Sequence, residues 1–437
     1  MNWVLYIICV LKWIVMILFR YLYTLFYILM MPFVLLRLWW KGRSMPAYRA
    51  RILERLSLDR MAPCPVDIWV HAVSLGEVIA ITPLIEQYLS KNKRILVTTM
   101  TPTGSNRVRE QFGERVIHRY VPYELPFALR RFFKTFKPTV GVIVETELWP
   151  NLIHFAHKSN VCLLLFNARL SEKSCRGYFK LIWFFKPLLN QFYGIHVQTE
   201  ADAARFKTLG ADPRRVHVTG NIKFDLTIKQ INFEPFVAIK SFWGAKRVIV
   251  IAASTHENEE QQLLNCLRRL QEKIPQVLFL IAPRHPERFE KVHQLACAMG
   301  FNTGLRSDTS TLNEHNDVVI LDCLGELLGF FHISDYAFIG GSLVPVGGHN
   351  MLEPIAMGVP VLTGPFVYNF LAICQSLLAV EGIIQISTAT EFVDNLSLLH
   401  DNEAAKAKLC TAASQVLHAN QGALQRYLIV TEEVLAQ

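Results

Sequence analysis

The amino-acid sequence predicts an α/β protein with two domains, each built on a parallel β-sheet that helices cover on both faces. Three observations support this fold class. The chain has 437 residues, which is more than one hydrophobic core usually supports. Short, continuously apolar runs alternate with helical stretches, as expected for parallel strands that are buried on both faces. This pattern weakens once, near the middle of the chain, where a domain boundary is expected.

The apolar runs form two series, one in each half of the chain. The first comprises residues 68–73, 95–99, 140–144, 161–166 and 195–199, and the second comprises residues 247–254, 277–283, 317–321, 336–342 and 359–364. Residues 226–244 have a weaker pattern and contain Pro235, so we place the linker there. We therefore expect a first domain at residues 41–228, a second domain at 229–415 and a C-terminal helical segment at 416–437.

The composition excludes several classes of protein. Hydrophobic residues make up 51% of the chain and charged residues 19%, and the mean hydropathy is +0.25, which excludes a disordered or acidic solvating chain. The 45 Lys and Arg outnumber the 36 Asp and Glu, which gives a net charge of +9 and favours anionic partners. Aromatic residues are not interleaved with a basic stripe, so nucleic-acid binding is not supported.

The nine cysteines are scattered singly, without a CxxC pair. Their odd number and their spacing predict neither a disulfide framework nor a zinc site. Most of them lie in apolar runs, where cysteine behaves as a small buried hydrophobe. We therefore expect a reducing, cytoplasmic environment.

Residues 1–40 are predicted to form a membrane anchor, because only Lys12, Arg20 and Arg37 interrupt a long run of large apolar residues. A signal peptide is disfavoured, since the run is too long and no small-residue cleavage site follows it. Crossing a bilayer takes about 20 helical residues, so a spanning helix requires Arg20 or Arg37 to snorkel to the interface. The alternative is a wholly interfacial amphipathic helix.

Basic residues follow this apolar run, namely Lys41, Arg43, Arg49, Arg51 and Arg55. Such residues set the cytoplasmic side of an anchor, so we expect the globular part to lie inside the cell. The arginines either dock onto an anionic surface or merely set the topology of the anchor.

Ligands of open parallel sheets bind at the carboxyl ends of the strands, so the residues that follow the apolar runs are candidates. In HAVSLGEV, Gly76 allows a turn and Glu77 begins a helix, where a carboxylate either complements the helix dipole or acts in catalysis. In VETELWPNL, Glu145 and Glu147 follow a strand in a loop that Trp and Pro order, where an ionised side chain needs a partner. Lys223, in TGNIKFD, is a candidate partner or else an exposed loop lysine.

The second half offers residues suited to an anion. Arg284 and His285 follow the apolar run 277–283, and a guanidinium there can bind a phosphate or form a surface salt bridge. The stretch FIGGSLVPVGGHNMLEP has two glycine pairs and a helix start near Asn350. Backbone amides freed by glycine and a helix N-terminus suit a nucleotide phosphate, although glycine also serves ordinary turns. Glu353 can accept hydrogen bonds from ribose hydroxyls.

Several well-known motifs are absent from the sequence. The chain has no GxGxxG, no GxxxxGK[ST] and no HExxH, so dinucleotide oxidoreductases, P-loop enzymes and zinc proteases lose their usual support. It also lacks Asp-x-Asp, which argues against a nucleoside diphosphate donor bridged by a metal.

Eight motifs occur in order along the chain: SLGE (74–77), TMTPTGS (99–105), ETELWPNL (145–152), NARLS (167–171), GNIKFD (220–225), STHENEE (254–260), PRHPERF (283–289) and GGSLVPVGGHNMLEP (340–354). Together with the apolar N-terminus they closely resemble the bacterial 3-deoxy-D-manno-octulosonic acid (Kdo) transferases over nearly the whole chain. The resemblance implies the GT-B fold, with two Rossmann-like domains facing a central cleft and an N-terminal membrane-anchoring helix. By analogy with the wider GT-B class, residues 416–437 are expected to pack back on the first domain.

Carried over to this sequence, the resemblance implies that Glu77 is the general base and that Glu145 and Lys223 assist the transition state. It assigns contacts with CMP to a set of residues in the second half: Pro283, Arg284, Leu324, Gly325, Glu326, Asn350, Met351, Leu352 and Glu353. It implies neither a metal ion nor another cofactor.

The resemblance further implies transfer of Kdo from CMP-Kdo to the lipid A precursor, lipid IVA, on the cytoplasmic face of the bacterial inner membrane. A sugar hydroxyl needs a carboxylate to take its proton. The leaving group is a monophosphate, whose charge Arg284 and backbone amides can stabilise without a metal, so we expect a metal-independent displacement with inversion. The expected partners are CMP-Kdo, lipid IVA and anionic inner-membrane lipids, and not nucleic acid.

Two other interpretations stay open at this point. A GT-B transferase that moves another nucleotide-activated sugar onto a membrane lipid is one of them. The other is an inactive GT-B protein that serves as a membrane scaffold, although the joint presence of Glu77, Arg284 and Glu353 would then lack a cause.

Overall fold

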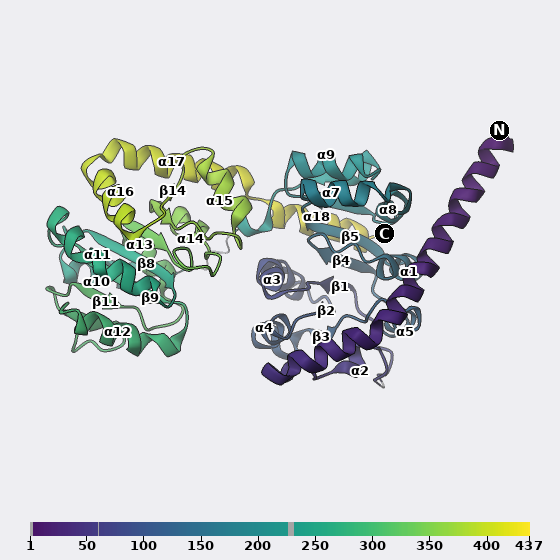
Figure 1. Cartoon of the computed structure of the whole chain (residues 1–437), viewed down its shortest axis with the longest axis horizontal. Coiled ribbons are helices and arrows are strands. Elements are labelled where there is room, and N and C mark those ends of the chain that lie inside the picture. Colours follow the sequence, from purple (N-terminus) through teal and green to yellow (C-terminus); the bar gives the residue numbers. More distant parts are fainter. Residues whose placement is uncertain (1–2, 60, 226–230) are drawn as a thin grey trace. The chain divides into compact units, whose positions relative to one another are not determined.

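The computed structural model describes residues 3–59, 61–225 and 231–437, without the side chains of residues 3–16 and of Ser44. The chain divides into two compact units (Figure 1): unit 1 comprises Met1–Asp225 and Gln421–Gln437, and unit 2 comprises Leu226–Asn420. The predicted domain boundary between residues 228 and 229 lies outside the described residues.

Unit 1 is built on a parallel sheet. In the described residues its strand order is β3-β2-β1-β4-β5-β6-β7, with β1 (Ile68–His71), β2 (Ile95–Thr99), β3 (Ile117–Tyr120), β4 (Val140–Val144), β5 (Cys162–Ala168), β6 (Gly194–Val197) and β7 (Val216–Val218). The five predicted runs of the first half are the five inner strands. The two edge strands were not predicted, because β3 and β7 contain His118, Arg119 and His217 and have a sheet neighbour on one side only.

Helices cover both faces of this sheet (Figure 1). They are α2 (Ile52–Arg55), α3 (Leu75–Ser90), α4 (Pro102–Phe112), α5 (Pro126–Phe136), α6 (Pro150–Lys158), α7 (Glu172–Phe179), α8 (Ile182–Leu189), α9 (Glu200–Thr208) and α18 (Ala423–Leu435), with short 3₁₀ turns at η1 (Pro46–Tyr48), η2 (Gly113–Arg115), η3 (Pro213–Arg215) and η4 (Ile222–Phe224). Residues of α3, α4 and α18 form the core on one face. Residues of α5, α6, α8 and α9 form the core on the other face.

Unit 2 has a second parallel sheet. Its order in the described residues is β10-β11-β9-β8-β12-β13-β14, with β8 (Ile249–Thr255), β9 (Leu278–Pro283), β10 (Thr303–Leu305), β11 (Val318–Ile320), β12 (Tyr336–Ile339), β13 (Val361–Thr363) and β14 (Ile384–Gln385). All five predicted runs of the second half are strands, and the edge strands β10 and β14 were again missed. Two parallel-sheet α/β units therefore confirm the predicted fold class.

The helices of unit 2 are α10 (Glu234–Trp243), α11 (Glu259–Lys273), α12 (Phe289–Ala298), α13 (Leu327–Ile333), α14 (Leu352–Ala356), α15 (Leu371–Leu378), α16 (Ala389–Asp401) and α17 (Glu403–Asn420), with a 3₁₀ turn at η5 (Pro286–Arg288). The linker predicted at residues 226–244 is wrong over its second half, which is α10. Pro235 lies in the first turn of α10, where a missing N–H costs nothing. Trp243 buries its side chain against Phe330, so α10 belongs to the packed unit.

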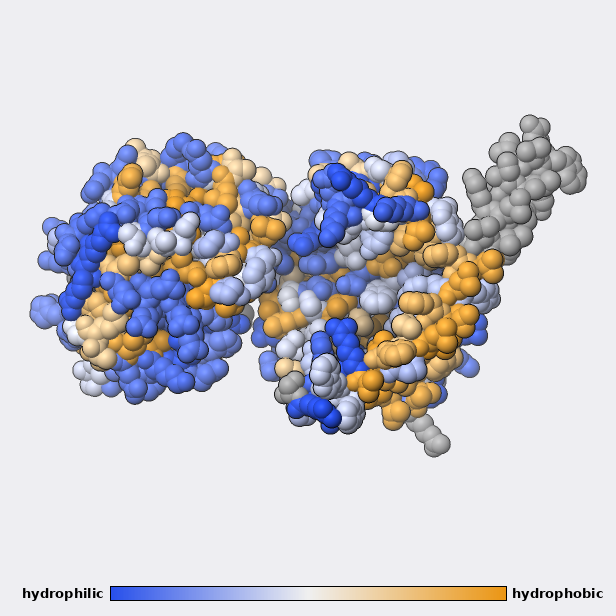
Figure 2. Space-filling model, in the orientation of Figure 1, coloured by the Kyte–Doolittle hydropathy of each residue, from blue (hydrophilic) through white to orange (hydrophobic). Residues whose placement is uncertain are grey.

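Helix α1 (Trp3–Ser44) packs one side of its described part on unit 1. The Asn151 amide donates to Thr24 Oγ1 at 2.9 Å and to the Glu124 carbonyl at 2.9 Å. Met31 is buried in a small apolar cluster with Tyr123. The opposite side of α1 exposes large apolar residues, which form an apolar band along the helix (Figure 2).

The basic residues after α1 differ in their surroundings. Arg43 and Arg49 are exposed. Arg55 is only 1% exposed; its guanidinium lies 3.8 Å from the ring centroid of Tyr120, and it donates to the Met100 carbonyl at 2.9 Å. Arg51 forms an ion pair with Glu54. The expectation that Arg51 and Arg55 face an anionic surface is therefore wrong, because packing inside unit 1 already uses both side chains.

The C-terminal helix α18 belongs to unit 1. Asp225 accepts hydrogen bonds from the backbone amides of Gly422 and Leu424, so it caps this helix from a distant part of the chain. Tyr427 is fully buried and stacks on Phe166 with ring centroids 4.1 Å apart. Residues 416–420, at the start of the predicted C-terminal segment, lie instead in α17 of unit 2.

Replacing Tyr427 by Phe tests how much the packing of α18 stabilises unit 1. The Tyr427 hydroxyl accepts from the Asn167 backbone N–H at 2.9 Å, and its loss leaves a buried donor unpaired. We expect Tyr427→Phe to lower the stability of unit 1 by about 1–3 kcal/mol, measured by denaturant unfolding of the full chain in detergent. Ile429→Ala, at a position that is 48% exposed, is the control. An equal loss of stability in both variants would contradict the stabilising role of the Tyr427 hydroxyl.

Candidate active site

Glu77 lies at the start of α3, just after the carboxyl end of β1. Ser74 is the N-cap of α3 and accepts from the Glu77 backbone N–H. In return, the Glu77 carboxylate accepts from the Val73 backbone N–H at 2.7 Å and from Ser74 Oγ at 2.7 Å. This reciprocal bonding resembles a capping box, except that the carboxylate accepts from the backbone N–H of Val73, the residue before the N-cap. The carboxylate is thereby fixed in position.

The same carboxylate has a perturbed acidity. Glu77 is only 7% exposed, and this burial raises its pKa to about 7, although the hydrogen bonds from Ser74 and Val73 oppose the shift and the charges of Glu145 and Glu147 add to it. Near neutral pH the group is therefore present both as a carboxylate and as an acid. A general base works best with a pKa close to the working pH.

Glu145 and Glu147 follow β4, the strand that pairs with β1 in the sheet. Glu145 has a φ of 60°, and its backbone N–H donates to the Phe166 carbonyl at 2.8 Å. The Glu147 carboxylate accepts from Trp149 Nε1 at 2.6 Å, and burial raises its pKa. The structure thus brings both glutamates close enough to Glu77 for their charges to act on it.

Lys223 lies in η4, and η4 contacts α3, the helix that has Glu77 in its first turn. Two asparagines hold this turn: Asn221 accepts from the Lys223 backbone N–H at 3.0 Å, and Asn167 Oδ1 accepts from the Ile222 N–H at 3.2 Å. Asn167 is fully buried with a φ of 55°, a conformation that Asn tolerates well. Sequence reasoning assigned it no role, although an Asn directly after the apolar run 161–166, in NARLS, was the available signal.

The TMTPTGS motif supports the turn that carries Glu77. The backbone amides of Met100 and Thr101 donate to the Val73 carbonyl at 3.1 and 3.2 Å. A Cβ on Gly104 would come within 3.3 Å of the Ser74 carbonyl carbon. Glycine at this position therefore lets the first turn of α4 approach the Ser74 turn closely.

Pro283 and Arg284 lie at the carboxyl end of β9, as expected, and the Arg284 amide donates to the Thr255 carbonyl at 3.0 Å. Two histidines that sequence reasoning missed lie nearby: His256 and His349, whose Nε2 atoms are 2.8 Å apart. Burial, followed by the charges of His256 and Arg284, lowers the pKa of His349 to about 4. In the described part of the chain no carboxylate pairs with Arg284. This edge of the sheet therefore suits an anion.

The first glycine pair differs from expectation. The Glu259 carboxylate, fully buried, accepts from the backbone amides of Gly341, Ser342 and Leu343 at 2.7, 3.1 and 2.9 Å. These amides are therefore not available to a phosphate, because an internal carboxylate already occupies the position of the anion. A Cβ on Gly340 would lie 2.6 Å from the Ser254 carbonyl oxygen, so glycine here serves close packing.

The helix start predicted near Asn350, after the second glycine pair, is confirmed as the start of α14. Asn350 Oδ1 accepts from the Leu352 backbone N–H at 3.1 Å, and its amide group donates to the Glu353 carboxylate at 3.0 Å. Met351 is the N-cap of α14, and burial raises the pKa of Glu353. Asn350 thus fixes the orientation of Glu353.

The remaining candidates of unit 2 follow β11, the neighbour of β9. Leu324 is 75% exposed, and Gly325 has a φ of 89°. Glu326 forms an ion pair with Arg306 at 3.0 Å. All the candidate CMP contacts therefore lie at or after the carboxyl ends of neighbouring or nearby strands of one sheet.

Among the described residues no group of three or more His, Cys, Asp or Glu side chains is arranged to hold a metal ion.

Comparisons with known proteins point to one family. Residues 48–226 match the family model described as 3-deoxy-D-manno-octulosonic-acid transferase (kdotransferase). A 3-deoxy-D-manno-octulosonic acid transferase from Haemophilus influenzae is 38% identical over 94% of this chain and 97% of its own length.

Two solved structures are also similar. The C-terminal CMP-Kdo binding domain of WaaA from Acinetobacter baumannii is 31% identical over 42% of this chain and 97% of its own length, with a TM-score of 0.41. A glycosyltransferase from Rickettsia africae covers 85% of this chain and 99% of its own length with a TM-score of 0.53 and 12% identity, a likeness of fold.

The raised pKa of Glu77 predicts how stability depends on pH. The pKa of Glu77 is about 7 in the folded chain and near 4.5 in the unfolded chain. Its contribution to the free energy of unfolding is therefore largest below pH 4.5 and is lost as the pH rises through 7. Glu77→Gln does not ionise, so between pH 4.5 and 8 its stability should rise relative to the wild type by about 2–3 kcal/mol. Unfolding measured at both pH values tests this.

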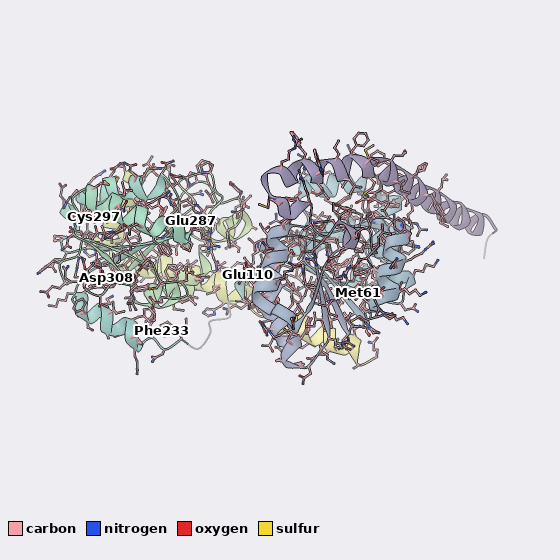
Figure 3. All side chains as sticks on the ribbon, turned by 90° about the horizontal axis from the view of Figure 1, so that it is seen from below. Met61, Glu110, Phe233, Glu287, Cys297 and Asp308 are labelled. Atoms are coloured by element: carbon pink, nitrogen blue, oxygen red, sulfur yellow. The ribbon has the colours of Figure 1, made fainter. Side chains whose placement is uncertain are left out.

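The control for this comparison is Glu110→Gln. Glu110 is an exposed residue of α4 (Figure 3), so this variant makes the same chemical change without removing a buried carboxyl group. A difference between Glu77→Gln and the wild type that is the same at pH 4.5 and 8 would contradict the raised pKa.

Proposed function

Because the chain belongs to the 3-deoxy-D-manno-octulosonic acid transferase family, we propose that it moves Kdo from CMP-Kdo to lipid IVA by a metal-independent displacement with inversion, on the cytoplasmic face of the inner membrane. The chain is a glycosyltransferase of lipopolysaccharide synthesis. The observation that carries the mechanism is Glu77: a buried carboxylate, fixed by two hydrogen bonds, whose pKa of about 7 suits a general base.

In the proposed reaction a hydroxyl oxygen of the acceptor bonds to the anomeric carbon of Kdo while the bond from that carbon to the CMP phosphate oxygen breaks. The hydroxyl proton passes to Glu77, and CMP leaves with the bonding electrons. Positive charge develops on the sugar ring, so the nearby carboxylate of Glu145 assists, and Lys223 stabilises negative charge. Inversion follows because the acceptor attacks the face opposite the leaving group.

The proposal assigns the donor to unit 2. Arg284, which no carboxylate of the described chain neutralises, lies beside His256 and His349 and matches the charge that develops on the CMP phosphate. Glu353, which Asn350 orients, is proposed to accept hydrogen bonds from ribose hydroxyls. Leu324, Gly325 and Glu326 complete the proposed contacts, together with Pro283, Met351 and Leu352.

The proposal assigns the acceptor and the membrane to unit 1. Arg43 and Arg49 are exposed directly after the apolar band of α1. Each basic residue near an anionic leaflet contributes about 1 kcal/mol of attraction. Basic residues at this end of an anchor favour the cytoplasmic side.

Transfer is tested by incubating the full chain in detergent with CMP-Kdo, lipid IVA and a chelator, and by weighing the lipid product in a mass spectrometer. We expect Kdo addition that survives the chelator. Glu77→Gln should lower kcat by about 10²–10⁴-fold and leave the affinity for CMP unchanged, whereas Glu110→Gln should be as active as the wild type. Transfer from a different nucleotide sugar and not from CMP-Kdo would favour a transferase with another donor. CMP binding without any transfer would favour an inactive scaffold. Either result would contradict the proposal.

The pH profile gives a separate test of the base. Since Glu77 must be ionised to take the proton and its pKa is about 7, kcat/KM should rise with pH up to about 7 and level off above it. The residual activity of Glu77→Gln should lack this rise. A wild-type profile that is flat between pH 5.5 and 8 would show that another group takes the proton.

A further inference from the structure

A pocket lies between the apolar helix α1 and the loop that carries Glu145 and Glu147. Its volume is about 410 Å³, within the range of sites for small ligands. Phe19 and Tyr23 line it from α1, Thr146, Glu147, Leu148, Trp149 and Pro150 from the loop and the start of α6, and Tyr178, Leu181, Phe184 and Phe185 from α7 and α8. Three separate parts of unit 1 thus form its walls.

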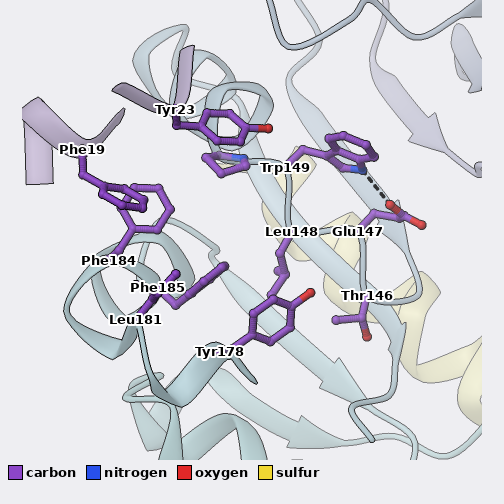
Figure 4. Close-up of a pocket in the computed structure, with 11 residues that line it drawn as sticks. Phe19, Tyr23, Thr146, Glu147, Leu148, Trp149, Tyr178, Leu181, Phe184 and Phe185 are labelled. Carbon is purple, nitrogen blue, oxygen red and sulfur yellow. Dashed lines mark hydrogen bonds between the residues drawn. The ribbon is translucent and has the colours of Figure 1, made fainter. Parts of the chain in front are cut away.

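The pocket is apolar at one end and polar at the other (Figure 4). Phe19, Phe184 and Phe185 gather at the α1 end, where the rings of Phe19 and Phe184 are 4.7 Å apart. Thr146 and Glu147 lie at the other end, one and two residues from Glu145. A molecule with an apolar tail and a polar head would therefore place its head beside the proposed catalytic residues.

A second cavity of about 230 Å³ adjoins this pocket, because Phe184 and Pro150 line both cavities. Its lining includes Arg20, His154 and Lys158. The charges of Arg20, Lys158 and Arg130 help to lower the pKa of His154 to about 4, after burial itself. No carboxylate of the described chain forms an ion pair with Arg20, Lys158 or Arg130. Like charges gathered in this way are stabilised when an anion binds among them.

One wall of both cavities is α1, whose opposite side exposes large apolar residues to the surroundings. Both cavities therefore lie behind the helix whose other side is apolar. The joint presence of an aromatic pocket and a cation cluster matches one class of ligand, an acylated and phosphorylated lipid.

We propose that these two cavities form the subsite for the acceptor lipid, in which the pocket at Phe19 and Leu181 holds one acyl chain and the cluster at Arg20 and Lys158 holds a phosphate. The proposal rests on the function proposed above and adds a reason for acceptor choice. The enzyme selects its acceptor by an acyl chain as well as by the reacting sugar, and α1 is a wall of the substrate site in addition to an anchor.

The acyl part is tested by filling the pocket. Leu181 is 37% exposed, so Leu181→Trp adds volume inside the pocket without opening the core; Phe179→Trp, at a position that is 51% exposed and does not line the pocket, is the matched control. Leu181→Trp should raise KM for lipid IVA by about 10-fold and leave KM for its fully deacylated derivative and for CMP-Kdo unchanged. An equal effect on the acylated and deacylated acceptors would overturn the proposal.

The phosphate part is tested with Lys158→Glu and its control Lys207→Glu on α9, since both lysines are exposed. Lys158→Glu should reduce the preference for the phosphorylated over the dephosphorylated acceptor by about 10-fold, as expected for loss of a charged contact. An unchanged preference would remove the cation cluster from the acceptor subsite.

Two further measurements separate the sources of failure. Binding of fluorescent lipid IVA to the full chain in detergent, without donor, should weaken in Leu181→Trp even if the transferred sugar were not Kdo, which separates this proposal from the proposed function. If added phosphatidylglycerol raises KM for lipid IVA in the wild type but not in Leu181→Trp, the pocket holds bulk phospholipid and the proposal is wrong.

Discussion

The burial of one carboxylate, that of Glu77, is the constraint on which the proposed site depends. The cap of α3 holds it through Ser74 and Val73, and the absent side chain of Gly104 lets α4 close against the same turn. Capping and catalysis looked like competing roles for this residue, but they are compatible. The hydrogen bonds of the cap fix the oxygens in place, while burial keeps the pKa high enough for the group to take and release a proton near neutral pH.

Unit 2 contains a contrasting carboxylate at the equivalent place, after β8. Glu259 also begins a helix and is also buried, yet it accepts from four backbone amides, those of His256, Gly341, Ser342 and Leu343. A carboxylate that is so fully bonded has few acceptor sites left for a substrate hydroxyl, although burial raises its pKa as well. Within the described chain, the Glu77 carboxylate accepts two hydrogen bonds and has two further glutamates nearby. The number of internal donors, rather than the position after a strand, separates the structural carboxylate from the catalytic candidate.

The sequence predicted those features that depend on local pattern. The inner strands of both sheets were found because burial on both faces requires continuous apolar runs, whereas edge strands such as β3, with His118 and Arg119, escape this requirement. Glu145 was found because it directly follows such a run, and Glu77 because only a short turn separates it from one. The pairing of His256 with His349 and the capture of the Gly341 amide by Glu259 were missed, since each joins segments more than 80 residues apart and leaves no local pattern.

The contacts of α1 indicate how it lies relative to a membrane more clearly than its hydropathy does. Residues 17–43 are long and apolar enough to cross a membrane, but Thr24 bonds to Asn151, and Met31 packs with Tyr123 of unit 1. A segment that crosses the hydrocarbon core cannot at the same time lie against the polar Asn151 and Glu124 of a globular unit without carrying them into lipid, at high cost. The exposed band of α1 (Figure 2) therefore favours the interfacial alternative for this part of the helix, with one side in lipid and the other on unit 1. In that arrangement both cavities that α1 lines lie close to the membrane surface, where an acylated acceptor would be found.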